Sequence, residues 1–334
     1  MKKRSIWWLL PLFLLGGALA GTYFWFRNGT QPMPSGEKFY IRYRERTPLE
    51  KVLNDLHQRG VVRSVDAFKM YARLKQISPE VGAGTYQLQP GMGAPMIFAQ
   101  LRKPVRQMVR IPETNWARRT ANLLEKKYNV GKAEEYMELV HRPAEFKDDV
   151  SFPLPAFSLE GYLFPDTYDL PPLMTSREVI QRQLKAFEKK VWQGLNKPKY
   201  IERILTLASL VELEAGTDED RPMIAGVVEN RLKRGMRLQI DATILYGMQE
   251  WRRLTYADYR NQKHPYNTYL IDGLPPGPIC SPSVASIKAV MKPAKHDYLY
   301  YVALPDGTSI FGRTYEEHKA NIRKRRRALA EAGE

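Results

Sequence analysis

One segment of the chain combines a helical apolar stripe with a carboxylate on that stripe. Residues 200–216 read YIERILTLASLVELEAG, and Glu212 lies four residues after Ala208 on the apolar side. The apolar positions follow the i, i+3, i+4, i+7 spacing of a buried helix face: Ile201, Ile204, Leu205, Ala208 and Val211. A carboxylate on such a face either pairs with a cation or retains its proton. The segment therefore predicts either a structural ion pair or a general acid that works near neutral pH.

The N-terminus predicts a membrane anchor. Lys2, Lys3 and Arg4 precede residues 6–26, which contain no charge, and Arg27 follows. A helix of that length spans a bilayer, and the basic N-terminal side should stay in the cytoplasm. A signal peptide cleaved after residues 18–20 (ALA) is the alternative, but the apolar run continues past that site. We therefore expect an uncleaved single-pass anchor in the plasma (inner) membrane at residues 1–27, a polar linker at 28–37, and the remaining chain on the outer face.

Composition narrows the possible partners. The 334 residues are 43% hydrophobic and 26% charged, which is typical of globular domains. Cys280 is the only cysteine and the five histidines show no ligand spacing, so we expect no disulfide, metal or cofactor. The net charge is +16, but an exported domain does not meet nucleic acid. Anionic lipids or wall polymers are more plausible partners; the basic cluster at 323–327 serves them or forms a solvated helix face.

The pattern along the chain is typical of an α+β protein with two globular regions. A small α/β unit is expected at 38–106, with strands at 39–43 and 84–88 and helices at 48–59, 65–77 (capped by Ser64) and 94–101. The second region, 107–334, should begin with a strand around 105–111. Its other predicted elements are helices at 115–128, 132–141, 177–194, 200–216, 220–234 and 283–291, an extended segment at 238–241, a hairpin at 298–302 and 308–311, and a basic terminal helix.

Five short segments place polar side chains in apolar or Gly/Pro-rich surroundings, as loops that line a cleft do. They span residues 160–168, 229–232, 238–247, 265–269 and 273–279. Their Asn, Gln, Asp and Tyr residues suit a polymer rich in hydroxyls and amides, whereas a phosphate site would need a Gly-rich loop ending in Lys. Each segment alone is more often a turn or a core tyrosine. Together, within about 120 residues of Glu212, they favour a carbohydrate site.

These segments carry a resemblance to the MltG (YceG-like) endolytic murein transglycosylases. The matching motifs, in chain order, are EGYLFPDTY (160–168), ASLVELE (208–214), NRL (230–232), MRLQIDATILY (236–246), YNTY (266–269) and GLPPGPI (273–279). Gly84-Thr-Tyr86 is similar to part of the LysM-like module of this family, and the N-terminal anchor also fits. The chain departs from the pattern at Leu213, Ile240, Ala242 and residues 280–283 (CSPS).

The resemblance implies a membrane-anchored lyase that cleaves the β-1,4 bond between MurNAc and GlcNAc without water and leaves 1,6-anhydro ends. In this interpretation Glu212 is the catalytic residue, first as acid and then as base, and requires a raised pKa. Glu160 and Asp241 are candidate neighbours of the acid, whereas Glu214 is expected in a helix-end ion pair with Arg221 or Arg231. The predicted substrate-binding residues are Glu160, Asn230, Gln239, Asp241, Tyr246, Tyr266, Asn267, Thr268 and Tyr269.

The implied partners are peptidoglycan strands and, beside the membrane, peptidoglycan synthases (penicillin-binding proteins) whose nascent strands the enzyme would terminate. Two other functions stay open at this stage. One is a non-catalytic glycan-binding scaffold for wall synthases, which has no reason to bury an acid such as Glu212. The other is a muramidase that adds water, which needs a second catalytic carboxylate across the cleft.

Overall fold

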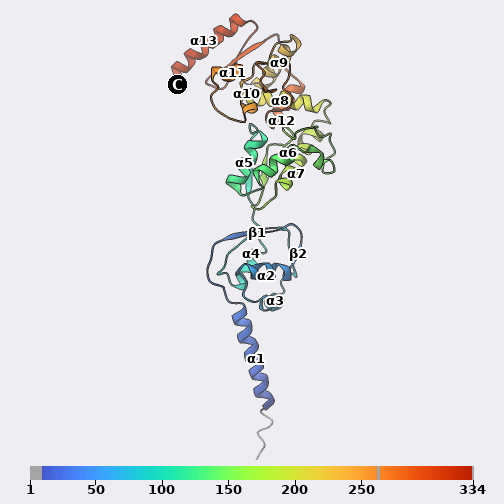
Figure 1. The fold of residues 1–334 in the computed structure, drawn as a ribbon, viewed down its shortest axis with the longest axis vertical. Helices are drawn as coiled ribbons and strands as arrows, with labels where there is room; N and C mark the ends of the chain where they lie inside the picture. The colour runs from blue at the N-terminus through green and yellow to red at the C-terminus, as the bar shows by residue number, and fades with distance from the viewer. Residues whose placement is uncertain (1–9, 262–263, 333–334) are drawn as a thin grey trace, which may run out of the picture. The chain divides into compact units, whose positions relative to one another are not determined.

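The structure is a computed structural model that describes residues 10–261 and 264–332 (Figure 1). The contacts divide the chain into two compact units. Unit 1 contains the described residues up to Gln107 together with Pro171–Met174, and unit 2 contains Met108–Leu170 and the described residues from Thr175 onward. Both units mix helices with short antiparallel strand pairs, so the predicted α+β class is confirmed.

Unit 1 joins four helices to two small sheets. β1 pairs with β4 so that Ile41 lies opposite Tyr86, and β2 pairs with β3. The predicted cap is confirmed, because Ser64 Oγ accepts a hydrogen bond from the Ala67 amide at 3.3 Å. The elements are α1 (Leu10–Gly29), β1 (Phe39–Tyr43), β2 (Thr47–Pro48), α2 (Leu49–Gln58), α3 (Val65–Leu74), β3 (Glu80–Val81), β4 (Gly84–Leu88) and α4 (Ala94–Gln100). Leu53, Phe68 and Leu88 are among the fully buried side chains that form its core.

The predicted membrane anchor covers residues 6–26, and residues 6–9 lie outside the described part of the chain. The remaining stretch, residues 10–26, lies entirely within α1. Across residues 10–261 and 264–332, no helix combines the length and the apolar character that crossing a membrane requires.

Unit 2 is mainly helical. Its elements are β5 (Met108–Arg110), α5 (Ala117–Tyr128), α6 (Ala133–Val140), η2 (Pro143–Phe146), β6 (Thr167–Asp169), α7 (Ser176–Phe187), η3 (Glu188–Gln193), α8 (Ile201–Glu214), α9 (Asp220–Lys233), α10 (Asp241–Met248), α11 (Tyr256–Asn261), α12 (Val284–Met291), β7 (Tyr300–Ala303), β8 (Ser309–Gly312) and α13 (Tyr315–Ala332). The predicted helix 177–194 becomes α7 followed by the π-helical turn η3. Elements β6, α10 and α11 were not predicted from the sequence, nor were β2 and β3 in unit 1.

Helix α8 lies at the centre of unit 2. It packs against α9, α10 and α12, and Leu205, Leu210 and Val211 are fully buried between them. The β7–β8 hairpin, in which Tyr301 lies opposite Phe311, packs against α13. This arrangement brings the C-terminal end of α8, the start of α10, the hairpin and α13 into one part of the unit, and the candidate site lies there.

Candidate active site

The last turn of α8 supplies two glutamates that point to different surroundings. Glu212 and Glu214 are two residues apart, so a helix rotates their side chains by about 200° relative to each other. Their separate environments decide which of them can exchange a proton with a ligand.

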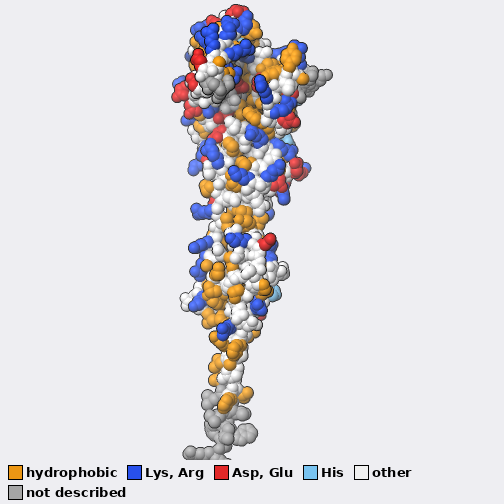
Figure 2. All heavy atoms as spheres, turned by 90° about the vertical axis from the view of Figure 1, so that its left-hand side faces the viewer, with side chains coloured by type: hydrophobic (Ala, Val, Ile, Leu, Met, Phe, Trp, Pro, Cys, Tyr) orange, Lys and Arg blue, Asp and Glu red, His pale blue; other side chains and the backbone are white. Residues whose placement is uncertain are grey.

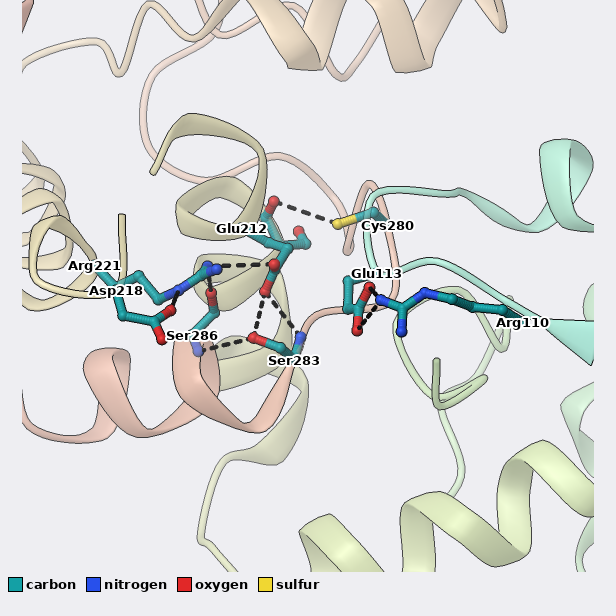
Figure 3. Close-up of polar contacts among 9 residues, drawn as sticks. Arg110, Glu113, Glu212, Asp218, Arg221, Cys280, Ser283 and Ser286 are labelled. Atoms are coloured by element: carbon teal, nitrogen blue, oxygen red, sulfur yellow. Dashed lines mark hydrogen bonds and ion pairs between the residues drawn. The ribbon is translucent and has the colours of Figure 1, made fainter. Parts of the chain in front are cut away.

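Glu212 takes the cation-paired alternative (Figure 3). Its Oε1 lies 3.2 Å from Nη1 of Arg221, and its Oε2 accepts hydrogen bonds from the Ser283 amide at 2.9 Å and the Ser283 hydroxyl at 2.6 Å. Arg221 also binds Asp218 and Ser286. The Glu212 side chain is only 5% exposed. This carboxylate joins α8, α9 and the start of α12, which is a structural role.

Glu214 instead lines a cleft of about 510 Å³. The walls come from the end of α8, from α9, from the segment 238–241, from β7 and from α13. The lining residues are Glu214, Arg231, Leu238, Gln239, Asp241, Tyr269, Tyr301, Val302, Ala303, His318, Ile322 and Arg325. Glu212 is not among the residues that line this cleft.

The surroundings of Glu214 make it a weak acid. Its Oε2 accepts a hydrogen bond of 2.8 Å from the hydroxyl of Tyr301. Burial raises the pKa of Glu214 to about 7, and the nearby carboxylate of Asp241 also raises it, whereas the Tyr301 hydrogen bond and Arg231 act in the opposite direction. A carboxyl group with this pKa is both acid and base near neutral pH, and the cleft gives a ligand access to it.

The predicted ion pair of Glu214 is wrong. Arg221 is paired with Glu212, and Arg231 donates to backbone carbonyls: Nε to Leu299 at 2.7 Å and Nη1 to Leu238 at 2.6 Å. Arg231 therefore ties the segment 238–241 to the region just before β7. Its contribution to the cleft is to hold two walls together.

Asp241 is the second carboxylate of the cleft. It begins α10 and accepts hydrogen bonds from the hydroxyls of Tyr259 at 3.0 Å and Tyr269 at 2.7 Å. The neighbouring Gln239 has a φ of +52°, a conformation that costs a non-glycine residue energy. Among the described residues, no group of three or more His, Cys, Asp or Glu side chains could hold a metal ion.

Three of the predicted substrate-binding residues line this cleft: Gln239, Asp241 and Tyr269. Three others, Asn230, Asn267 and Thr268, form hydrogen bonds to other residues of the protein. The amide of Asn230 donates to the carbonyls of His296 and Tyr298, and Thr268 Oγ1 accepts from the Ile240 amide at 2.9 Å. Asn267 and Thr268 are fully buried, and Asn267 Oδ1 accepts from the Tyr269 amide. These polar atoms bond to backbone groups: Asn230 to the region before β7, Thr268 to the segment that bears Gln239, and Asn267 to the loop that bears Tyr269. Their role as ligand contacts stays a prediction.

The remaining three predicted residues, Glu160, Tyr246 and Tyr266, form a separate cluster. Both carboxylate oxygens of Glu160 lie within 3.1 Å of the Ala117 amide, so Glu160 caps the start of α5. The hydroxyl of Tyr246 is 3.4 Å from Glu160, and the rings of Tyr246 and Tyr266 are 4.7 Å apart. Burial raises the pKa of Glu160 to about 7. The cluster borders a small cavity of about 100 Å³, which Glu160 and Tyr266 line.

Several residues of the cleft were not singled out from the sequence. Tyr301 was predicted only as part of a strand, and His318 and Arg325 only as part of a basic terminal helix. The one available signal was spacing, because His318, Ile322 and Arg325 follow the i, i+4, i+7 pattern of one helix face. That pattern does not reveal which element the face contacts.

Comparisons with known proteins agree on one class. Residues 41–324 match the YceG-like family. The endolytic murein transglycosylase of Bacillus subtilis strain 168 is 30% identical, over 90% of this chain and 89% of that protein. The protein of that name from Streptococcus pneumoniae strain D39 is also 30% identical, over 96% of this chain and 65% of that protein. A crystal structure of a YceG-like protein from Listeria monocytogenes is similar, with a TM-score of 0.57 and 29% identity, over 85% of this chain and 99% of that chain.

The fold and these matches define a class of α+β proteins rich in helices. The chain belongs to the YceG-like family.

Proposed function

We propose that this chain is an endolytic lytic transglycosylase that cleaves the MurNAc–GlcNAc bond of murein without water and leaves 1,6-anhydro ends. Family membership and the names of the curated relatives support a murein transglycosylase. The observation that carries the mechanism is the carboxyl group of Glu214, which has a pKa of about 7 and lines a cleft.

The proposed reaction needs one group that first gives and then takes a proton. Protonated Glu214 donates its proton to the glycosidic oxygen, the C–O bond to the anomeric carbon breaks, and the free sugar end leaves. The Glu214 carboxylate then accepts the proton of the C6 hydroxyl, whose oxygen bonds to the anomeric carbon of the same sugar. Because this attack is intramolecular, it gains a high effective concentration. Asp241, as a carboxylate, would stabilise the positive charge that develops on the sugar ring.

This proposal moves the catalytic role from Glu212 to Glu214. Glu212 is engaged by Arg221 and by two donors of Ser283, and proton donation from it would disrupt that network. Among residues 10–261 and 264–332, Tyr301 is the one donor to Glu214, which leaves the other carboxylate oxygen available to a sugar.

A hydrolytic muramidase is the second candidate, because Asp241 lines the same cleft as Glu214. In that reaction Asp241 would activate water or attack the sugar, which requires two working carboxylates. A pure scaffold, in contrast, has no use for a carboxyl group that lines a cleft and exchanges its proton near neutral pH.

Mass spectrometry of murein glycan digested by the purified chain tests the three functions. We expect anhydro ends from the wild type and none above background from Glu214→Gln, which should still bind glycan. Reducing ends with one added water would indicate hydrolysis, and no new ends would indicate a scaffold. Asp241→Asn sharpens the test, because it should abolish hydrolysis but only slow the anhydro reaction.

We also propose that the enzyme acts beside the membrane on new strands. The uncharged run at 6–26 after three basic residues supports an anchor, and residues 38–106 support a LysM-like module that binds glycan. A catalytic unit at 107–334 on the outer face would then meet strands as synthases release them. Equal activity of the full chain and of residues 28–334 toward nascent and mature wall would contradict this.

A further inference from the structure

We propose that Arg325 is a specificity residue of the cleft and binds an anionic group attached to the glycan, namely a carboxylate of the peptide stem. The inference rests on the proposed function, since it assumes that a murein strand occupies the cleft of Glu214. Neither the catalytic mechanism nor the predicted glycan contacts requires this cation.

The first observation is the position of Arg325 in the cleft. Arg325 lines the same cleft as Glu214, but it comes from α13, which is more than 100 residues later in the sequence than α8. In the described part of the chain, Arg325 has no acidic partner. Arg231 of the same cleft, in contrast, donates its hydrogen bonds to backbone carbonyls. An exposed guanidinium in a site that also contains Glu214 is a ready partner for a planar carboxylate.

The second observation is a buried nitrogen on the same face of α13, two helical turns before Arg325. Nδ1 of His318 is buried and has no hydrogen-bond partner among the residues that the structure describes. His318 lies seven residues before Arg325 on the same face of α13, and its ring stacks on Tyr300 with centroids 5.1 Å apart. An unsatisfied buried polar atom is costly, so a ligand or a water that reaches this nitrogen would stabilise the site.

The third observation is the charge of the helix. Residues 323–327 are RKRRR with no acid among them, and the acids of the first turn are occupied: Glu316 pairs with Lys319, and Glu317 accepts from the Arg313 amide. Figure 2 views the molecule from the side on which α13 lies in Figure 1. It shows Lys and Arg side chains, in blue, gathered at the end of unit 2 where α13 is drawn in Figure 1. A neutral glycan backbone gives no reason for this charge, but the stem carboxylates of murein do.

The test compares two substrates and two arginines in the full-length chain. Soluble strands with free stem carboxylates are compared with the same strands after conversion of those carboxylates to amides. The value of kcat/KM is measured by release of anhydro ends at about 0.5 M NaCl, where long-range attraction by the net charge is screened. We expect the wild type to prefer the free carboxylates by about 5- to 10-fold. Arg325→Gln should lose this preference, and Arg325→Lys should keep part of it.

Arg323→Gln is the matched control, because it removes the same charge from the same helix at a position outside the cleft lining. It should retain the wild-type preference. The inference is overturned if the wild type does not discriminate, if Arg325→Gln still discriminates, or if both variants lose the preference equally, which would indicate general charge attraction.

Binding of the two strands to Glu214→Gln, alone and combined with Arg325→Gln, separates this inference from the proposed function. A carboxylate preference in binding that disappears with Arg325→Gln supports the inference even when the wild type releases no anhydro ends. A wild type without cleavage would overturn only the proposed function.

Discussion

At the scale of single residues, desolvation by distant segments decides which glutamate is the acid. The apolar stripe of the sequence correctly placed Glu212 in the interior. It did not reveal that Arg221 and Ser283 would engage this carboxylate. The groups that raise or tune the pKa of Glu214 come from α9, α10 and β7, which are distant in sequence, so no helical periodicity could identify it.

Replacement of Glu214 should reveal its raised pKa as a change in stability. The folded state holds the Glu214 proton up to about pH 7, whereas the unfolded chain releases it near the ordinary value of 4.5. The wild type therefore loses stability as the pH rises from about 4.5 to about 7, and the penalty is complete above that range. Glu214→Gln has no such penalty. We expect the substitution Glu214→Gln to change the free energy of unfolding differently at the two ends of this range. The change at about pH 8 should be more stabilising than the change at about pH 4 by about 2–3 kcal/mol.

Urea denaturation at the two pH values measures this difference. Burial also raises the pKa of Glu160, so Glu160 adds the same pH dependence to the stability of the wild type and of Glu214→Gln. Only the difference between the two proteins therefore reports on Glu214. An identical effect of the substitution at both pH values would mean that Glu214 titrates normally.

Replacement of Glu212 should act on stability rather than on chemistry. Glu212→Gln leaves Arg221 paired with Asp218 alone and weakens the bonds to Ser283. We expect a loss of about 1–3 kcal/mol in the free energy of unfolding at neutral pH. Thermal and chemical denaturation check this, and unchanged stability would contradict the structural role.

At the scale of elements, most of the helices and both strands of the β7–β8 hairpin were predicted from the sequence. The shortest elements were not. Regular apolar spacing identified α2, α3, α7 and α8, and strands β1 and β4 were predicted with their correct bounds. Helix α10 was missed because it is short (residues 241–248) and shows no amphipathic period. The two-residue strands depend on pairing partners rather than on local sequence. For the site, the motifs supplied Gln239, Asp241 and Tyr269, but the contributions of β7 and α13 depend on tertiary packing.

The segment that bears Gln239 and Asp241 should depend on the buried hydroxyl of Thr268. Thr268→Val keeps the shape but leaves the Ile240 amide without its acceptor. We expect a loss of about 1–3 kcal/mol in stability and, at a temperature where the protein stays folded, a several-fold fall in kcat because Asp241 is displaced. Circular dichroism confirms folding in the same samples. A stable variant with full kcat would show that this hydrogen bond does not position the cleft.

At the scale of the whole molecule, charge should govern how quickly substrate arrives. The net charge of +16 attracts anionic wall polymer, and salt screens that attraction. We expect kcat/KM on stem-bearing strands to fall several-fold between about 0.05 and about 0.5 M NaCl, with little change in kcat. Strands with amidated stems are the control and should show a weaker salt dependence. An equal salt dependence of kcat/KM for both substrates would show that the stem carboxylates are not the source of the attraction.

The most direct measurement of the central claim is the pH dependence of kcat/KM for the wild type and for two matched substitutions on α8. The wild type should lose activity as the pH rises through about 7, because Glu214 must enter the reaction protonated. Glu214→Gln should lose at least about 10²-fold at and below about pH 7, whereas Glu212→Gln, assayed where it is folded, should stay within about tenfold of the wild type and keep its pH profile. A larger loss in Glu212→Gln than in Glu214→Gln would contradict the assignment of Glu214 as the catalytic acid.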